Sequence, residues 1–188
     1  MTDAGAPESP VTLVVRDARP DERDVVHALT RAAYAEYAHV MASEAWALLE
    51  RAVHAALDAG GAAECIVAER GGQIVGSVFL FPPASDAYTG FAEPPRWPEL
   101  RLLAVTPEAR GLGAGEALVR ECARRARVAG ATALGLHTSA SMAAARRLYG
   151  RLGFVRAPEH DFRPEGAELV EGYRLPLADA EGGPVDSA

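Results

Sequence analysis

A glycine-rich turn between a strand-like run and a helix-like run is the feature that most restricts how this chain can fold. The turn reads Arg-Gly-Leu-Gly-Ala-Gly at 110–115, the run before it spans 99–105, and the run after it spans 113–129. Glycines let a backbone approach an anion closely, and the dipole of the following helix favours negative charge at its first turn. The sequence therefore predicts a phosphate-bearing cofactor at this turn.

Two familiar phosphate-binding motifs do not fit. A P-loop needs Lys and then Ser or Thr after its last glycine, whereas Glu116 and Ala117 follow Gly115. A dinucleotide fingerprint needs a third glycine at position 116 or 118, and position 118 is Leu118. That fingerprint also opens the first βα unit of its domain, whereas this turn lies past the middle of the chain. Neither class of nucleotide site is indicated.

The spacing that fits is Arg-x-x-Gly-x-Gly at Arg110, Gly113 and Gly115, followed by Leu-Tyr-x-x-Leu-Gly-Phe at 148–154. Together these motifs resemble the GCN5-related N-acetyltransferase (GNAT) family, most closely over about 99–155. The resemblance implies an N-acetyltransferase that moves an acetyl group from acetyl-CoA to a primary amine of a small molecule or peptide by direct attack on the thioester. The alternative is a non-catalytic acyl-CoA-binding or regulatory module with the same fold.

Periodicity outside the turn favours a mixed α+β domain, because strands cluster before and after helices and Gly71-Gly72 marks a hairpin. The resemblance adds a central, mostly antiparallel twisted sheet, flanked by helices and splayed at the cofactor strand. We expect one GNAT-like domain over 11–177, between disordered tails at 1–10 and 178–188. Strands are expected at 11–15, 64–69, 73–81, 99–105, 133–138 and 169–177, and helices from about 20, at 43–57, at 113–129 and at 141–150.

Composition excludes several classes of partner. A net charge of −7 disfavours nucleic acid, and no apolar run is long enough to span a bilayer. Residues 1–10 do not read as a signal peptide, and two cysteines form no disulfide framework, so we expect a cytoplasmic protein. The five histidines lack ligand spacing, so no metal is expected. A homodimer is left open.

The resemblance places acetyl-CoA along the cofactor strand and over the turn. Backbone N–H groups near 112–116 would bind the pyrophosphate, and the pantetheine arm would pair with the strand at Leu103 and Val105. The family often has an asparagine where this chain has Met142, so the hydroxyl of Ser139 or Ser141, or a water, would make that contact. The expected cofactor residues are Leu103, Ala104, Val105, Arg110, Gly111, Leu112, Gly113, Ala114, Gly115, Glu116 and Ser141.

Two residues are expected to carry protons. Tyr149 would be the general acid for the leaving thiolate, and Glu99 the base that acts on the amine through water. The alternation of the cofactor strand is lost at Leu102-Leu103, which indicates either a β-bulge or burial on both faces. His137 and Cys122 are expected in the core. Aromatic residues available for substrate contacts include Tyr34, Tyr37, Trp46, Tyr88, Phe91 and Trp97.

Overall fold

The apolar runs of the sequence form one seven-stranded sheet in the computed structural model, which describes residues 12–58, 63–85 and 96–177. Its order is β1-β2-β3-β4-β5-β7-β6, and every neighbouring pair is antiparallel except β4 and β5. The strands are β1 (Leu13–Asp17), β2 (Glu64–Arg70), β3 (Gln73–Phe81), β4 (Glu99–Val105), β5 (Ala133–Thr138), β6 (Val155–Arg156) and β7 (Glu171–Pro176). This confirms the expected mixed α+β class with a mostly antiparallel sheet.

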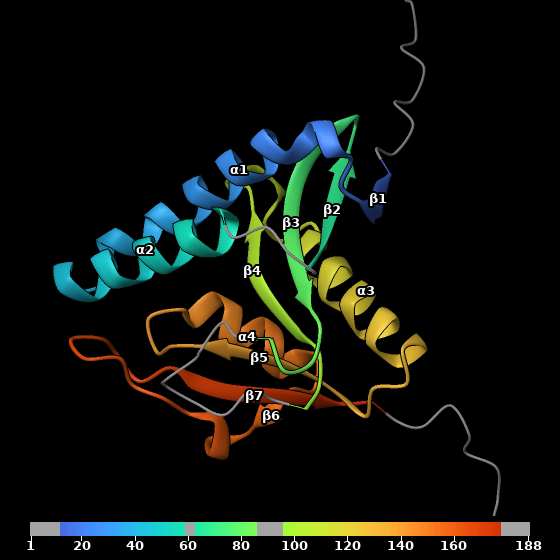
Figure 1. The fold of residues 1–188 in the computed structure, drawn as a ribbon. Helices are drawn as coiled ribbons and strands as arrows, with labels where there is room; N and C mark the ends of the chain where they lie inside the picture. Colours follow the sequence, from blue (N-terminus) through green and yellow to red (C-terminus); the bar gives the residue numbers. More distant parts are fainter. Residues whose placement is uncertain (1–11, 59–62, 86–95, 178–188) are drawn as a thin grey trace, which may run out of the picture.

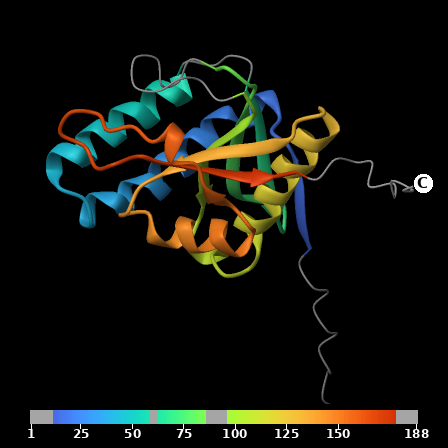
Figure 2. The ribbon, with the colours of Figure 1, turned by 90° about the horizontal axis from the view of Figure 1, so that it is seen from below.

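Helices cover both faces of the sheet (Figures 1 and 2). Figure 2 shows α1 and α2 on one side and α3 and α4 on the other. The α-helices are α1 (Arg23–Ala35), α2 (Ser43–Asp58), α3 (Ala114–Val128) and α4 (Ala143–Arg151), and the short 3-10 turns are η1 (Pro20–Glu22), η2 (Glu36–His39), η4 (Pro107–Ala109) and η5 (Pro158–His160). None of the helices in the described ranges has the length and apolar character needed to cross a membrane.

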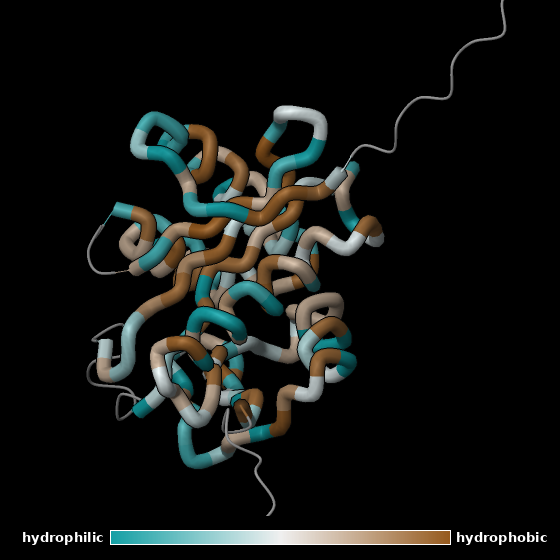
Figure 3. The backbone as a smooth tube through the Cα atoms, turned by 90° about the vertical axis from the view of Figure 1, so that its right-hand side faces the viewer, coloured by the Kyte–Doolittle hydropathy of each residue, from teal (hydrophilic) through white to brown (hydrophobic). Residues whose placement is uncertain are grey.

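The core lies between α3 and the central strands. Leu118 and Cys122 of α3 are fully buried against a cluster that includes Ile66, Val78 and Leu134. Figure 3 shows the hydrophobic runs of the chain gathered along the strands at the centre of the molecule. Burial raises the pKa of the Cys122 thiol to about 12, so the thiol stays protonated and acts as a core side chain, as expected.

Several expected boundaries shift. The first strand runs over 13–17 instead of 11–15, because the pairing with β2 extends to Asp17. The helix expected at 141–150 covers 143–151, and the last strand covers 171–176. The expected tails at 1–10 and 178–188 lie outside the described residues, as do Tyr88 and Phe91.

A β-bulge interrupts β4 at the position where the sequence loses its alternation. Ser77 pairs with Ala104 and Phe79 pairs with Arg101, so β4 carries one residue more than β3 between these pairs. Leu102 takes up the extra length with a φ of 54°, a left-handed conformation that is uncommon for a leucine. The bulge, one of the two open explanations, is therefore present.

The sheet parts directly beside this bulge, and we call the opening between β4 and β5 the fork (Figure 1). Only Glu99 and Gly135 pair across these two strands, and the Gly135 N–H donates to the Pro98 carbonyl at 2.8 Å. Beyond that pair, the edge of β4 that faces β5 has no strand partner among the described residues. The splay expected at the cofactor strand thus begins at the first residue of β4.

Where the backbone pairing between β4 and β5 ends, buried polar side chains connect the two strands. Glu99 is 2% exposed, and its carboxylate lies 3.0 Å from His137 Nδ1 on β5 and 2.6 Å from an Arg101 guanidinium nitrogen on β4. The other ring nitrogen of His137 lies 3.0 Å from the carbonyl oxygen of His160. Both ring nitrogens of His137 therefore lie within hydrogen-bond distance of an oxygen atom. This group joins the two arms of the fork at its base.

Burial alone would raise the pKa of Glu99, but hydrogen bonding and charge from His137, together with Arg101, outweigh it and hold that pKa below its usual 4.5. Because the folded pKa is the lower one, the carboxylate stabilises the fold above its unfolded value. That contribution is lost as the pH falls through the folded value.

Replacing Glu99 with Gln should lower the free energy of unfolding near neutral pH by about 3 kcal/mol, because the buried Arg101 guanidinium loses its anion and His137 loses its carboxylate partner. Urea titrations would measure this loss, and Glu44→Gln on the exposed start of α2 should change stability by less than about 0.5 kcal/mol. The gap between wild type and Glu99→Gln should narrow below about pH 4. Equal stability of the two proteins at neutral pH would contradict a charged clamp at the fork.

Candidate active site

The fork opens into a cleft of about 540 Å³ that is lined from both helical layers. One wall comes from the end of α1 and from η2, the floor from β4 at 103–105, and the other wall from the glycine-rich turn and from 143–151. Because residues from both faces of the sheet line it, the cleft can receive one reactant from each side.

The glycine-rich turn presents backbone donors to this cleft. Gly111 and Gly113 have φ values of 75° and 87°, which bring the chain from β4 into α3. The first hydrogen bond of α3 runs from the Ala117 N–H to the Gly113 carbonyl at 2.9 Å, so the N–H groups of residues 114–116 have no partner within the helix. Such a terminus suits a phosphate group.

Gly115 is needed for close packing beside the turn. A Cβ there would lie 3.3 Å from Leu148 Cδ2, because the start of α3 packs tightly against α4. The two helices that form this wall therefore approach one another through a glycine, and the wall stays narrow.

The expected cofactor residues converge on the cleft. All of them line it except Leu112, whose side chain is 50% exposed. Residues as far apart in sequence as Leu103 and Ser141 therefore share one surface. The backbone of β4, the turn and the segment before α4 therefore border one cleft.

Arg110 does not stand alone at this surface. Its guanidinium forms two hydrogen bonds, of 2.7 and 2.8 Å, with the carboxylate of Glu36 on η2 across the cleft. These hydrogen bonds lower the pKa of Glu36 and keep it ionised. An anionic ligand in the cleft would compete with Glu36 for Arg110.

Glu116 would repel a phosphate if its carboxylate faced the turn. Its carboxylate instead pairs with Arg120 one helical turn further along α3, at 2.8 Å. This i,i+4 pair neutralises the charge at the helix terminus and holds the side chain against the helix surface.

Ser141 lines the cleft, but its side chain is engaged elsewhere. Its hydroxyl and backbone N–H both donate to the carboxylate of Glu168 in the loop before β7. These hydrogen bonds lower the pKa of Glu168. Met142, at the position of the family asparagine, is the N-cap of α4 and makes no capping hydrogen bond with its side chain.

Tyr149 is buried in the core and is not exposed in the cleft. It is 5% exposed, packs 5.5 Å from the ring of Phe154, and is not among the residues that line the cleft. Burial raises its pKa well above the ordinary range, so the phenol stays protonated. Ala145, one turn earlier on the same face of α4, does line the cleft, and Tyr37 lines it from the opposite wall.

Glu99 lies at the base of the fork, away from the residues that line the cleft. Both of its oxygens are engaged, one by His137 and one by Arg101. Arg101 also donates to the Ser85 hydroxyl at 2.9 Å and lies over the Phe81 ring at 4.4 Å. The structure thus gives Glu99 a place in the scaffold of the fork.

Sequence reasoning missed part of the wall. Glu36 and Val40 of the η2 region and Arg151 at the end of α4 line the cleft, and none was singled out. Arg151 lies three residues after Leu148 of the tyrosine motif, which also lines the cleft, so helical spacing along α4 could have suggested it. No local signal marks Glu36, since its proximity to Arg110 spans 74 residues. No group of three or more potential metal ligands occurs in the described ranges.

Solved structures resemble this one across nearly the whole chain. A GNAT acetyltransferase from Brucella melitensis in complex with acetyl-CoA is 22% identical, with a TM-score of 0.58, covering 92% of this chain and 94% of the other. The acetyltransferase YncA from Salmonella typhimurium with its cofactor acetyl-CoA is 19% identical, with a TM-score of 0.59 and coverage of 93% and 99%. A ribosomal-protein-alanine N-acetyltransferase from Brucella melitensis is 20% identical, with a TM-score of 0.58 and coverage of 87% and 99%.

These structural likenesses establish the fold. No curated protein matches the sequence closely. The model of the acetyltransferase (GNAT) family matches residues 24–154, which contain the fork, the glycine-rich turn and the tyrosine motif. The expected family and enzyme class are thereby confirmed, and the chain belongs to the GNAT family of acetyltransferases.

Proposed function

We propose that this protein transfers an acetyl group from acetyl-CoA to a primary amine of a small molecule or peptide. The observation that carries the proposal is the cleft at the fork, where an unpaired strand edge and a glycine-rich helix terminus lie side by side. Two structural neighbours hold acetyl-CoA, and a third is named for acetylation of a protein alanine. An amine acceptor suits all of these features.

The donor would bind mainly to backbone. The N–H groups at 114–116 and Arg110 suit the pyrophosphate, and the free edge of β4 at Leu103 and Val105 suits the amides of pantetheine. Substitutions that change only a side chain at these positions would weaken donor binding less than substitutions that change the backbone φ. Ser141 would contribute its surface only, because its hydroxyl is bonded to Glu168.

Transfer requires one bond to form and one to break. The neutral amine nitrogen attacks the thioester carbonyl carbon, the carbon–sulfur bond breaks, and coenzyme A leaves as a thiolate that takes up a proton. Leu103 directly follows the bulge at Leu102 and lines the cleft, and its N–H would stabilise the developing oxyanion. The amine loses its proton to water or to a base.

The proton roles rest on Tyr149 and Glu99. Tyr149 keeps its proton and lies on the face of α4 that borders the cleft, which suits a donor to the thiolate. Glu99 is ionised but enclosed, so its part as base would run through a water relay from the fork. Through its contact with Arg101, the residue before Leu102, Glu99 would also hold the bulge in place.

The net charge of the chain suits an amine substrate, and its free cysteines suit a cytoplasmic location. A net charge of −7 and Glu36 in the cleft would attract a protonated amine. Cys65 and Cys122 are free thiols, which suits the reducing environment of the cytoplasm.

Thermal melting tests the cofactor. At about 100 times the Kd, acetyl-CoA and free CoA should each add about 2.7 kcal/mol and raise the Tm by roughly 5–10 °C, whereas NAD and ATP at equal concentration should not. Gly113→Ala is the variant expected to weaken acetyl-CoA binding. The added Cβ would meet no atom within 4 Å, but an alanine is strained at the φ of 87° that Gly113 adopts. Its shift with acetyl-CoA should be smaller than that of wild type.

A shift with NAD or ATP in place of acetyl-CoA, or with none of the four ligands, would refute the proposed donor.

Tyr149→Phe tests the acid. Turnover should fall by about 10²-fold while the Kd for acetyl-CoA is unchanged, because the phenol acts on the leaving thiolate and not on binding. Thiol release over a pH series and calorimetric titration measure the two quantities. Tyr37→Phe on the opposite wall serves as the comparison.

Full turnover of Tyr149→Phe across pH would remove the acid role. If Tyr37→Phe alone lost turnover, the role would pass to Tyr37. A chain that binds acetyl-CoA but acetylates no amine would be the non-catalytic module.

A further inference from the structure

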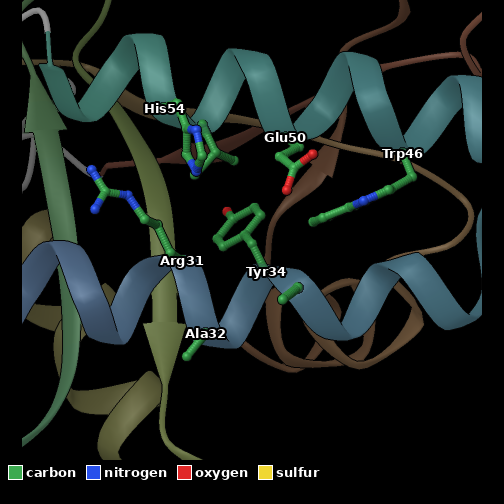
Figure 4. A pocket seen from close by; sticks show the side chains of 8 residues that line it. Arg31, Ala32, Tyr34, Trp46, Glu50 and His54 are labelled. Atoms are coloured by element: carbon green, nitrogen blue, oxygen red, sulfur yellow. The ribbon is translucent and has the colours of Figure 1, made fainter.

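A second groove, of about 250 Å³, lies between α1 and α2, and no step of the proposed reaction uses it (Figure 4). It is separate from the fork, yet Tyr34 lines both. One tyrosine therefore connects this groove with the cleft in which the acetyl group would be transferred. We call it the interhelical groove, and its lining residues are Arg31, Ala32, Tyr34, Ala35, Trp46, Glu50, Val53 and His54.

Helical spacing explains why these side chains face one another. Trp46, Glu50 and His54 recur every four residues and form one stripe along α2. In Figure 4 the Glu50 carboxylate points between the rings of Tyr34 and Trp46. On the α1 side of the groove, Ala32 and Ala35 have small side chains, which leave the space between the two rings open.

The charges in the groove are unequal. The Arg31 guanidinium lies 3.8 Å from the carboxylate of Asp58 at the end of α2, and this carboxylate partly neutralises its charge. Glu50 forms no ion pair with any residue that the structure describes. A carboxylate between two aromatic rings is a setting that attracts a cation, because both the anion and the ring faces are electron-rich.

We infer that the interhelical groove holds a second, protonated amino group of the acceptor, so that the preferred substrate class is a diamine. This inference rests on the proposed function. One nitrogen of such a substrate stays an ammonium against Glu50, Trp46 and Tyr34. The other passes Tyr34 into the fork, loses its proton and attacks the thioester.

A matched series of amines tests this substrate class. Wild type is assayed for thiol release with α,ω-diaminoalkanes, with the n-alkylamine of the same chain length, and with the ω-amino acid of that length. Each comparison changes only the far end of the acceptor, from ammonium to methyl or carboxylate. The variants are Glu50→Gln and Trp46→Leu, with Glu44→Gln as the control that removes a charge elsewhere on α2.

The diamine should exceed the monoamine in kcat/KM by about threefold to tenfold at its best chain length. Glu50→Gln and Trp46→Leu should remove that preference, because each lowers kcat/KM for the diamine more than for the monoamine, while Glu44→Gln keeps it. Equal rates for diamine and monoamine, or a preference for the ω-amino acid, would overturn the inference while the transferase stands. Failure to acetylate any amine would refute the proposed function itself.

Discussion

The contact of the Glu99 carboxylate with His137 and Arg101 is the interaction on which the site depends. Parallel strands β4 and β5 share one backbone pair and then part, so no ladder holds their relative position. The buried Glu99 carboxylate supplies that constraint, because it contacts Arg101 on β4 and His137 on β5. Arg101 directly precedes the bulge residue Leu102, so the same clamp fixes the backbone that would meet the thioester. If the clamp were lost, the width of the fork and the direction of the bulge would change together.

The fork explains why one cleft can serve two substrates. Because the sheet is open there, the wall formed by α1 and η2 and the wall formed by the glycine-rich turn face each other. The donor side offers backbone N–H groups and φ-permissive glycines, which suit phosphates and amides. The acceptor side offers Glu36, Tyr34 and Tyr37, which suit a cationic amine. Arg110 and Glu36 pair across the cleft, so binding of the donor would exchange a protein anion for a ligand anion.

Local features of this fold could be predicted from the sequence, and long-range ones could not. The turn at 110–115 was readable because its spacing is a local signal, and the lost alternation at Leu102-Leu103 indicated either a bulge or burial on both faces. One partner of Glu99, His137, lies on another strand, and the other, Arg101, is two residues away on β4, which by itself gives no sign that the carboxylate is buried. The capture of the Ser141 hydroxyl by Glu168 is likewise set by the loop before β7. The tyrosine motif marked Tyr149, but its burial in the core depends on how α4 packs against the sheet.

Hydrogen exchange of single backbone amides with and without acetyl-CoA tests the central claim most directly, because the account assigns the donor to backbone at the fork. Acetyl-CoA should slow exchange at 103–105 on the free edge of β4 and at 114–116 in the first turn of α3. Amides of β1, far along the sheet from the fork, should not change. Protection confined to the helices α1 and α2, or no protection at either backbone segment, would contradict a donor site built on the parting of β4 and β5.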